Sequence, residues 1–308
     1  EAPAQGFLPQ SGEVLTFVPP RIAGVRVDHG LKPRDRVTPH YDPMIAKLIA
    51  TGATRQDART RLVAALQDTT VLGITTNRAY LIDVLGDAEF IAGEATTAFL
   101  GKRFAGWTEP TARTSRDLAI LAALVLETSG ERGGGSLAGW SSTGVAVSPL
   151  RMAIDERVIE ASGQARAAGW RIEVEGTSHV VDLVAADDGT ARVDIDGQRL
   201  GVRFARDGAR LHAAIGAMTL TVLDVTRAPS RRGEGAAQNR LLAPMNGKVV
   251  RVLGQAGDSV AKGQCVVVLE AMKMQHEIVA GRAGTLASVM VAVGQQVATR
   301  AVLAELAD

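Results

Sequence analysis

The sequence predicts a multidomain protein with an α+β part in front and all-β parts behind. Its 308 residues exceed the roughly 100 to 200 residues of a typical domain. Helix-like and strand-like runs mix in 1–105, one apolar helix precedes period-two runs in 106–226, and two similar β-rich halves fill 241–308. Residues 227–240 ("RAPSRRGEGAAQNR") lack apolar periodicity and are rich in Gly, Ala, Arg and Ser, which predicts a flexible linker.

Composition and charge exclude several classes of function. With 34 basic and 33 acidic residues the net charge is +1, so we expect no nucleic-acid partner. No apolar run approaches the roughly 20 residues of a membrane helix, so we expect no membrane span. The single cysteine, Cys265, excludes an internal disulfide and fits a reducing compartment, with the cytoplasm as first expectation and the mitochondrial matrix as the alternative. The start, "EAPAQGFLPQ", has neither an initiator Met nor a signal-peptide layout, so we expect a processed or trimmed chain, or one whose front end is absent here.

The first segment predicts two helices among short strands. Thr54 with Asp57 three residues later has the pattern of a capping box, and Gly73 is a plausible stop for the helix that follows. A second helix is expected to open at Asn77.

The middle segment predicts a helix that does not lie alone on a surface. Thr114 or Ser115 is its expected cap, and residues 118–126 are almost uniformly apolar. We therefore expect the helix either to be buried in its own domain or to dock on a partner protein.

Period-two runs follow this helix and are punctuated by Asp-Gly turns. Such pairs, at Asp188, Asp196 and Asp207, are a strong short-range signal for hairpins. The segment thus predicts an antiparallel meander that closes as a small barrel.

The last segment contains an internal repeat with an offset of 37 positions. Each half is too small to bury its own strands, so the halves should pack face to face as a flattened barrel. The repeated positions are Gly247 and Gly284, Val252 and Val289, Gly257 and Gly294, Val260 and Val297, Ala261 and Ala298, and Leu269 and Leu306.

The crossover between the halves, "VLEAMKMQHEI", places Lys273 between Met272 and Met274. A tight hairpin usually has Asn, Asp or Gly here, so we infer that the turn is kept because its side chain must project. An isolated lysine of this kind is most often a solvated turn residue with methionines as gap fillers. Its position at the centre of a repeat, behind a linker and after "APMNGKVV", favours function instead.

"EAMKM" together with "APMNGKVV" resembles the biotinyl domain of biotin-dependent carboxylases. The resemblance implies that a biotin protein ligase joins biotin to Lys273, flanked by Met272 and Met274. A lysine amine is a good nucleophile once deprotonated, and its acylated form carries no charge into an apolar site. A lipoyl domain, in which Asp precedes and Ala follows the lysine, is the alternative carrier. A structural hairpin adaptor, as in membrane-fusion proteins, would need coiled-coil heptads that the sequence lacks.

The first segment resembles the end of a biotin carboxylase domain, which has the ATP-grasp fold. The matching stretches are "EAPAQGFLPQSGEV", "GVRVDHG", "VTPHYDPMIAKLI" and "GITTNRAYL". The resemblance implies that Arg26 is catalytic; the alternative is an outward-facing arginine that pairs with Asp28, and Lys47 is expected to be structural. ATP, Mg and bicarbonate would bind in a part of the family's fold that precedes these residues. The chain itself is not expected to hydrolyse ATP, since "ERGGGSLAG" lacks the order of a P-loop.

The middle segment resembles the domain that joins the α subunit of acyl-CoA carboxylases to the carboxyltransferase β subunit. The similarity rests on the order of elements and on "GWSSTGVAVSPLR", around Trp140 and Arg151. Together the resemblances imply an α subunit of 3-methylcrotonyl-CoA carboxylase type, an enzyme of leucine catabolism, with propionyl-CoA or another acyl-CoA carboxylase as the alternative. They also imply a large hetero-oligomer in which the β subunit binds the acyl-CoA. Pyruvate carboxylase is disfavoured, because no carboxyltransferase-sized domain separates the ends. No metal site is expected, because His29, His40, His179, His212 and His276 lack ligand spacing.

Overall fold

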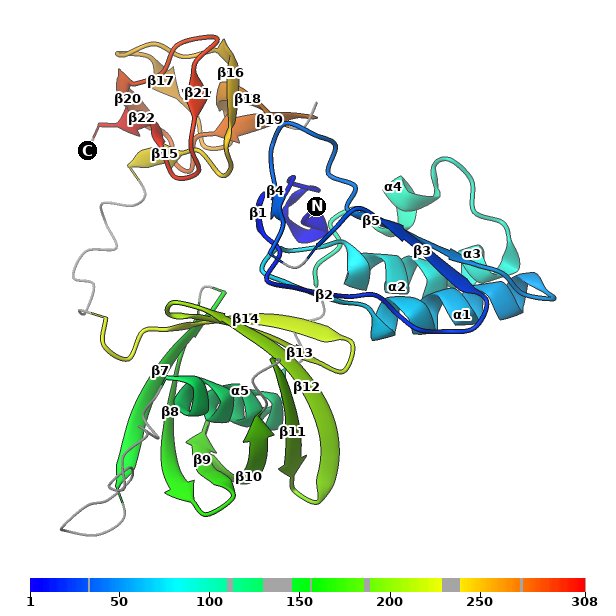
Figure 1. Cartoon of the computed structure of the whole chain (residues 1–308). Coiled ribbons are helices and arrows are strands. Elements are labelled where there is room, and N and C mark those ends of the chain that lie inside the picture. Colours follow the sequence, from blue (N-terminus) through cyan, green and yellow to red (C-terminus); the bar gives the residue numbers. More distant parts are fainter. Residues whose placement is uncertain are drawn as a thin grey trace.

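The computed structural model describes residues 1–32, 34–109, 113–129, 146–155, 157–185, 189–228, 239–271 and 274–307. Its helices and strands form three groups along the chain (Figure 1). They are a first group of helices and short strand pairs, a closed barrel around a helix, and a module of two small sheets. The predicted fold class, α+β followed by two all-β parts, is confirmed. No helix among the described residues is long and apolar enough to cross a membrane.

The first group consists of short antiparallel strand pairs beside four helices. The strands pair as β1 with β4, β2 with β6 and β3 with β5. The elements are η1 (Pro3–Gln5), β1 (Gly12–Glu13), β2 (Thr16–Val18), β3 (Val25–His29), β4 (Arg36–Val37), β5 (Ala46–Ala50), α1 (Arg55–Asp68), β6 (Thr70–Leu72), α2 (Arg78–Gly86), α3 (Ala88–Ala92) and α4 (Phe99–Arg103).

Helix α1 begins at the predicted capping box and ends before the predicted stop. The Thr54 hydroxyl accepts from the Asp57 N–H at 3.1 Å, and the Asp57 carboxylate accepts from the Thr54 N–H at 3.1 Å. The expectation that Gly73 ends this helix is wrong, because the chain has already turned into β6. Gly73 serves close packing instead: with φ +105°, an added Cβ would lie 2.2 Å from the carbonyl oxygen of Glu13. Helix α2 opens after Asn77, as predicted.

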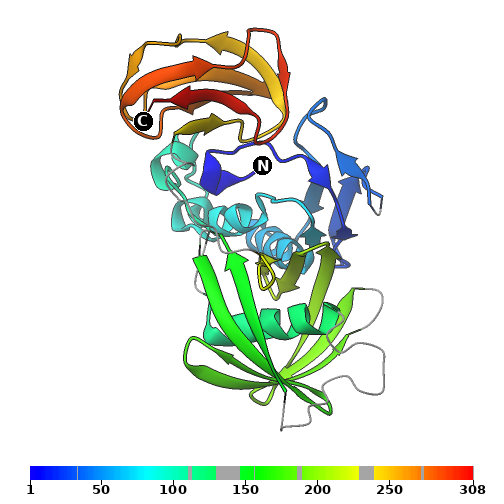
Figure 2. The same cartoon turned by 90° about the vertical axis from the view of Figure 1, so that its left-hand side faces the viewer.

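The middle group is a closed antiparallel barrel of eight strands, in the order β10-β11-β12-β13-β14-β7-β8-β9. Helix α5 (Ser115–Thr128) runs through its interior (Figure 2). The strands are β7 (Val147–Ile154), β8 (Arg157–Arg166), β9 (Gly169–Val174), β10 (Thr177–Ala185), β11 (Thr190–Ile195), β12 (Gln198–Asp207), β13 (Arg210–Ile215) and β14 (Met218–Asp224). The predicted hairpin turns at Asp196 and Asp207 are confirmed by the register of the strands beside them, whereas Asp188 lies outside the described residues.

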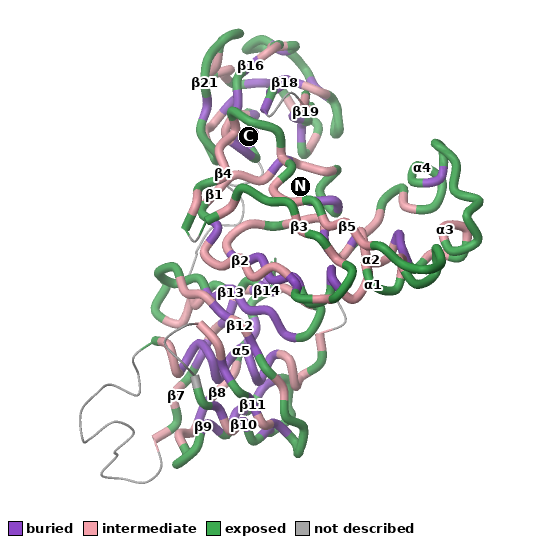
Figure 3. Tube along the Cα trace, turned by 45° about the vertical axis from the view of Figure 1, so that its right-hand side comes forward, coloured by how far each residue is buried: buried purple, intermediate pink, exposed green. Residues whose placement is uncertain are grey.

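Helix α5 is the core of the barrel and not an exposed docking element. Its nine consecutive residues 118–126 are all buried, which Figure 3 shows as a buried helix inside buried strand faces. Thr114 is the cap, with Asp117 completing a capping box. An added Cβ on Gly163 of β8 would lie 2.2 Å from Leu126, so the barrel wall closes directly on the helix. Of the two readings of this apolar stretch, burial in its own domain is the correct one.

A polar chain fixes the front end of this helix in the barrel. Ser115 Oγ lies 3.0 Å from His179 Nε2, and His179 Nδ1 lies 2.9 Å from Asp196 Oδ2. These residue types match a nucleophile, a base and an orienting acid. However, none of the three lines the pockets of the first group or the cavity between that group and the barrel. The chain therefore anchors α5 to the β11–β12 hairpin.

The last group is a flattened barrel of two four-stranded sheets, β15-β22-β20-β17 and β19-β18-β16-β21. An offset of 37 positions relates the first sheet to the second: β15 and β17 correspond to β19 and β21 further along the chain, and β22 and β20 correspond to β18 and β16 earlier in it. The predicted repeat is therefore a pseudo-twofold relation of structure. The elements are β15 (Arg240–Leu242), β16 (Gly247–Val252), β17 (Ser259–Val260), β18 (Cys265–Ala271), β19 (Met274–Val279), β20 (Gly284–Val289), β21 (Gln296–Val297) and β22 (Val302–Leu306).

The repeat predicts a stabilising substitution at Arg300. Arg300 has φ +68°, and its counterpart in the first half, Gly263, has φ +84°. A left-handed backbone costs an L-residue about 1 kcal/mol, so Arg300→Gly should raise the free energy of unfolding by up to about 1 kcal/mol in urea denaturation. The reciprocal control, Gly263→Ala, should lower it, since no atom lies within 4 Å of an added Cβ and only the backbone matters. A destabilised Arg300→Gly chain would contradict the argument.

Candidate functional site

The hairpin of β18 and β19 carries the predicted attachment site. Ala271 and Met274 pair in register, as do Glu270 and Gln275. Met272 and Lys273 stand between Ala271 and Met274 in sequence and lie outside the described residues. Met274 opens β19 and is half-buried. The pairing makes this hairpin the direct connection between the two halves of the repeat.

Gly247 brings the motif "APMNGKVV" against the hairpin. Strand β16 pairs with β18, with Lys248 opposite Glu270. An added Cβ on Gly247 would lie 2.8 Å from the Glu270 carbonyl oxygen and 3.6 Å from the Ala271 Cβ. Only glycine allows the strands to approach this closely, so "APMNGKVV" packs against Glu270 and Ala271 at the end of β18.

Asn246, the residue before this glycine, ties the first half of the repeat to the second. Its Oδ1 accepts hydrogen bonds from the N–H of Thr299 at 2.8 Å and from the Thr299 hydroxyl at 3.3 Å. Its Nδ2 donates to Ser11 Oγ of the first group at 3.5 Å, a long hydrogen bond. The strands that support the hairpin are thus fixed from both halves.

His276 points into this module from β19. Its Nε2 is buried and has no hydrogen-bond partner, and burial lowers the pKa of the imidazole. The ring is therefore neutral near pH 7 and packs as a weakly polar group, three residues after Lys273 in sequence. Sequence spacing excluded it as a metal ligand but did not show that it faces inward.

Arg26 lies on the exposed face of the β3–β5 ribbon. Its guanidinium makes two contacts of 3.1 Å with the Asp28 carboxylate, and the two side chains are 70% and 52% exposed. Lys47 pairs in register with Asp28 and is also exposed. The arrangement shows the Asp28 pairing that the sequence offered as the alternative to catalysis. It also leaves Arg26 accessible to an anionic ligand.

Beside this ribbon a pocket of about 320 Å³ opens against Asp28 and Lys47. His29 and Met44 also line it, and the His29 ring packs edge-on against Phe17 at 4.7 Å. Among the described residues, no three His, Cys, Asp or Glu side chains gather to hold a metal ion. The ribbon therefore offers charged side chains for an anion rather than ligands for a metal.

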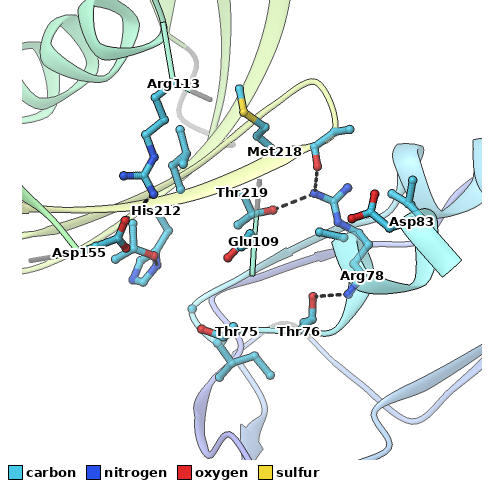
Figure 4. A pocket seen from close by; sticks show the side chains of 17 residues that line it. Thr75, Thr76, Arg78, Asp83, Glu109, Arg113, Asp155, His212, Met218 and Thr219 are labelled. Atoms are coloured by element: carbon cyan, nitrogen blue, oxygen red, sulfur yellow. Dashed lines mark hydrogen bonds and ion pairs between the residues drawn. The ribbon is translucent and has the colours of Figure 1, made fainter. Parts of the chain in front are cut away.

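Arg78 is a buried arginine whose role the sequence did not reveal. It opens α2, and its guanidinium reaches across to the β13–β14 hairpin of the barrel (Figure 4). A cavity of about 340 Å³ lies beside it, between the first group and the barrel. Its acceptors are up to 141 positions away in sequence, and no local motif announces such a contact.

Among the described residues, Arg26 interacts with Asp28 on its own ribbon, and no interaction joins it to the β18–β19 hairpin. Trp140 lies outside the described residues. Arg151 lies in β7, opposite Glu160 of β8, and its N–H donates to the Thr226 hydroxyl at 3.0 Å.

Two protein families match the two ends of the chain. Residues 1–102 match the biotin carboxylase C-terminal domain, and residues 239–306 match the family described as biotin-requiring enzyme. The chain carries a biotin carboxylase C-terminal domain and a biotin–lipoyl domain. The second domain indicates covalently bound biotin as the cofactor.

Curated relatives match nearly the whole chain. The propionyl-CoA carboxylase alpha chain of Homo sapiens is 29% identical, over 99% of this chain and 45% of its own length. The methylcrotonoyl-CoA carboxylase subunit alpha of Dictyostelium discoideum is 28% identical, over 90% of this chain and 43% of its own. The biotin-dependent acyl-coenzyme A carboxylase alpha3 subunit of Mycobacterium leprae is 29% identical, over 99% of this chain and 42% of its own length.

The chain thus spans less than half the length of these relatives and is similar to alpha subunits of biotin-dependent acyl-CoA carboxylases, which are enzymes. Propionyl-CoA and methylcrotonoyl-CoA types match to the same degree, so similarity does not separate them.

The close approach at Gly247 predicts that this position tolerates no side chain. Gly247→Ala should lower the free energy of unfolding by roughly 1–3 kcal/mol, because the Cβ must displace the Glu270 backbone. Urea unfolding checks the stability, and biotin incorporation checks the hairpin. Gly281→Ala is the matched control, since its added Cβ meets no atom within 4 Å. Equal stability of the two variants would refute the packing argument.

Proposed function

We propose that this chain is the C-terminal part of the α subunit of a biotin-dependent acyl-CoA carboxylase. One observation carries the proposal: a biotin carboxylase C-terminal domain and a biotin–lipoyl domain with "EAMKM" at its central hairpin stand on the same chain. We further propose the domain bounds 1–105, 106–226 and 241–308, with 227–240 as a linker.

Lys273 is the proposed attachment site. Once its amine is acylated, the side chain is a long neutral arm, so it enters an apolar site without the cost of burying a charge. Met272 and Met274 beside it offer weakly polar surfaces that adapt to more than one docking site. Bound biotin supplies a carrier for a carboxyl group between a carboxylase site, which uses ATP, Mg and bicarbonate, and a carboxyltransferase site.

Arg26 is the proposed catalytic residue of the carboxylase part. A guanidinium stays charged at all relevant pH and stabilises negative charge on an oxygen through forked hydrogen bonds. Its exposed ion pair with Asp28 contributes little stability, so exchanging Asp28 for a substrate oxygen costs little.

The proposed partners are a carboxyltransferase β subunit, which binds the acyl-CoA, and a biotin protein ligase, in a large hetero-oligomer. The order of elements in the middle segment supports 3-methylcrotonyl-CoA as the substrate, which would place the enzyme in leucine catabolism. Propionyl-CoA is the second candidate, supported by the propionyl-CoA carboxylase relatives. The cytoplasm is the proposed location, and the mitochondrial matrix is the alternative.

Attachment of biotin is tested by the intact mass of the chain after co-expression with a biotin protein ligase. A biotin increment should appear on the peptide that contains Lys273 and vanish in Lys273→Arg. Lys262→Arg, an exposed lysine of the same module, is the control and should keep the increment. An unmodified wild-type chain would refute the carrier role, and a lipoyl increment in a native preparation would assign the chain to a dehydrogenase complex.

The role of Arg26 is tested in the full-length subunit. Arg26→Gln should lower the rate of biotin carboxylation by about 100-fold or more, the usual loss when a charge-stabilising donor is removed. Biotin incorporation and the unfolding midpoint should stay unchanged. Arg34→Gln removes a comparable exposed ion pair, with Glu13, and should keep full activity. If both variants behave like wild type, Arg26 is only the surface partner of Asp28.

A further inference from the structure

One buried strand of the first group, β6, lies against the barrel. Strand β6 contacts β12, β13 and β14 of the barrel, and Thr70, Val71 and Leu72 are all buried. Arg203 of β12 donates to the Thr70 hydroxyl at 3.3 Å. A cavity of about 340 Å³ on one side and an open pocket of about 690 Å³ on the other limit this contact.

Arg78 ties the two sides of this contact together. One guanidinium nitrogen, Nη1, donates to the carbonyl oxygens of Leu66 at 3.2 Å, Gln67 at 3.3 Å and Thr69 at 3.0 Å. These carbonyls lie at the end of α1, where the helix leaves them without partners of its own. The other nitrogen, Nη2, donates to Ala217 O at 2.5 Å and Thr219 Oγ1 at 2.9 Å, both in the β13–β14 hairpin.

The burial of Arg78 makes this link hard to replace. The residue is 7% exposed, and among the described residues no carboxylate forms a salt bridge with it. Burial lowers the pKa of its guanidinium, and the charge of Glu109 across the cavity counteracts this. Without the guanidinium, acceptors on both sides would lose their donor inside a contact from which water is largely excluded.

We propose that Arg78 is a positioning residue that holds the barrel on the carboxylase domain in one orientation. The inference rests on the proposed function, in which a carrier visits a carboxylase site and a carboxyltransferase site. With the barrel locked, the separation of those two sites is constant and the biotin–lipoyl domain alone travels. Interfaces between domains of one chain otherwise permit relative motion.

The orientation is tested on this chain by distances between two spin labels. Labels at Glu94→Cys in the first group and Glu173→Cys in the barrel, with Cys265→Ser, should give one narrow distance distribution. Arg78→Met, which keeps the length of the side chain but removes its donors, should broaden or shift it. Thr219→Val, which removes one acceptor of Arg78, should broaden or shift the distance distribution to a smaller extent. Arg59→Met is the matched control, because Arg59 donates to Leu85 O within the first group.

Catalysis is tested in the full-length subunit with its β subunit. Arg78→Met should lower overall carboxylation of the acyl-CoA by about tenfold or more, since a misplacement of ~1 Å can cost ~100-fold. ATP hydrolysis dependent on free biotin should stay at the wild-type rate, which a mere loss of folding would not allow.

A narrow, unshifted distribution in Arg78→Met, or an unchanged overall rate, overturns the proposal. If Arg78→Met does not fold, Thr219→Val is the test. An unshifted, narrow distance distribution or an unchanged overall rate in Thr219→Val then overturns the proposal. No overall carboxylation in the wild-type enzyme would refute the proposed function instead, and the label distances would then decide alone whether Arg78 orients the barrel.

Discussion

The exchange of strands between the two halves of the last module is the constraint on which its carrier role depends. Each sheet contains strands from both halves, since β16 pairs with β21 and β17 pairs with β20. Neither half can therefore form its sheet without the other. The crossover that joins them is the β18–β19 hairpin, so the proposed attachment site stands where the covalent connection and the sheet pairing meet.

The same symmetry places the ends of the module opposite this hairpin. The pair of Leu269 and His276 in the hairpin corresponds, 37 positions away, to Leu306 and Asn239, whose backbones are hydrogen-bonded. Figure 1 shows β15 and the C-terminus on one side of the module and β19 on the other. A module held at its chain ends thus presents the β18–β19 hairpin from the far side, and the length of the module adds to its reach.

Periodicity and turn chemistry were sufficient to predict the architecture, because these signals are local. The capping boxes at Thr54 and Thr114, the helix start at Asn77 and the repeat all involve residues that are close in sequence or equally spaced. Gly73 was misread as a helix stop, because a glycine required for close approach to Glu13 has the same sequence signature as a glycine that ends a helix.

Contacts between distant segments could not be predicted in this way. The apolar pattern of 118–126 is the same whether a barrel or a partner protein covers it, and only tertiary structure separates the two. Arg78 is one arginine at a helix start until the carbonyls of α1 and the barrel hairpin come together around it. Resemblance to a family, and not spacing, singled out Arg26. Lys273 was already notable for its position at the crossover of the repeat, and the resemblance supplied its role.

The contrast between Arg26 and Arg78 follows from desolvation. Both are arginines at the start of regular elements, but Arg26 is exposed to water and pairs with a carboxylate two residues away, whereas Arg78 is buried among neutral acceptors from three segments. Water screens the first pair, so it exchanges easily with an incoming anion. If the Arg78 guanidinium left its acceptors, several buried carbonyl oxygens would lose their hydrogen-bond donor, so the guanidinium stays in place. An ion pair that exchanges easily suits the catalytic role proposed for Arg26. A guanidinium with several buried acceptors suits the positioning role proposed for Arg78.

If the first group and the barrel are held in one orientation, only the linker and the biotin–lipoyl domain behind them move. The sequence of 227–240 predicts a flexible chain whose typical span is roughly 20 Å. If the barrel could also move, the distance between the two catalytic sites would vary, and so would the distance that the linker has to span. With Arg78 holding the barrel, a short linker and the length of the module define a constant search volume. The effective concentration of the carrier at each site then depends on the length and stiffness of the linker and on the length of the module.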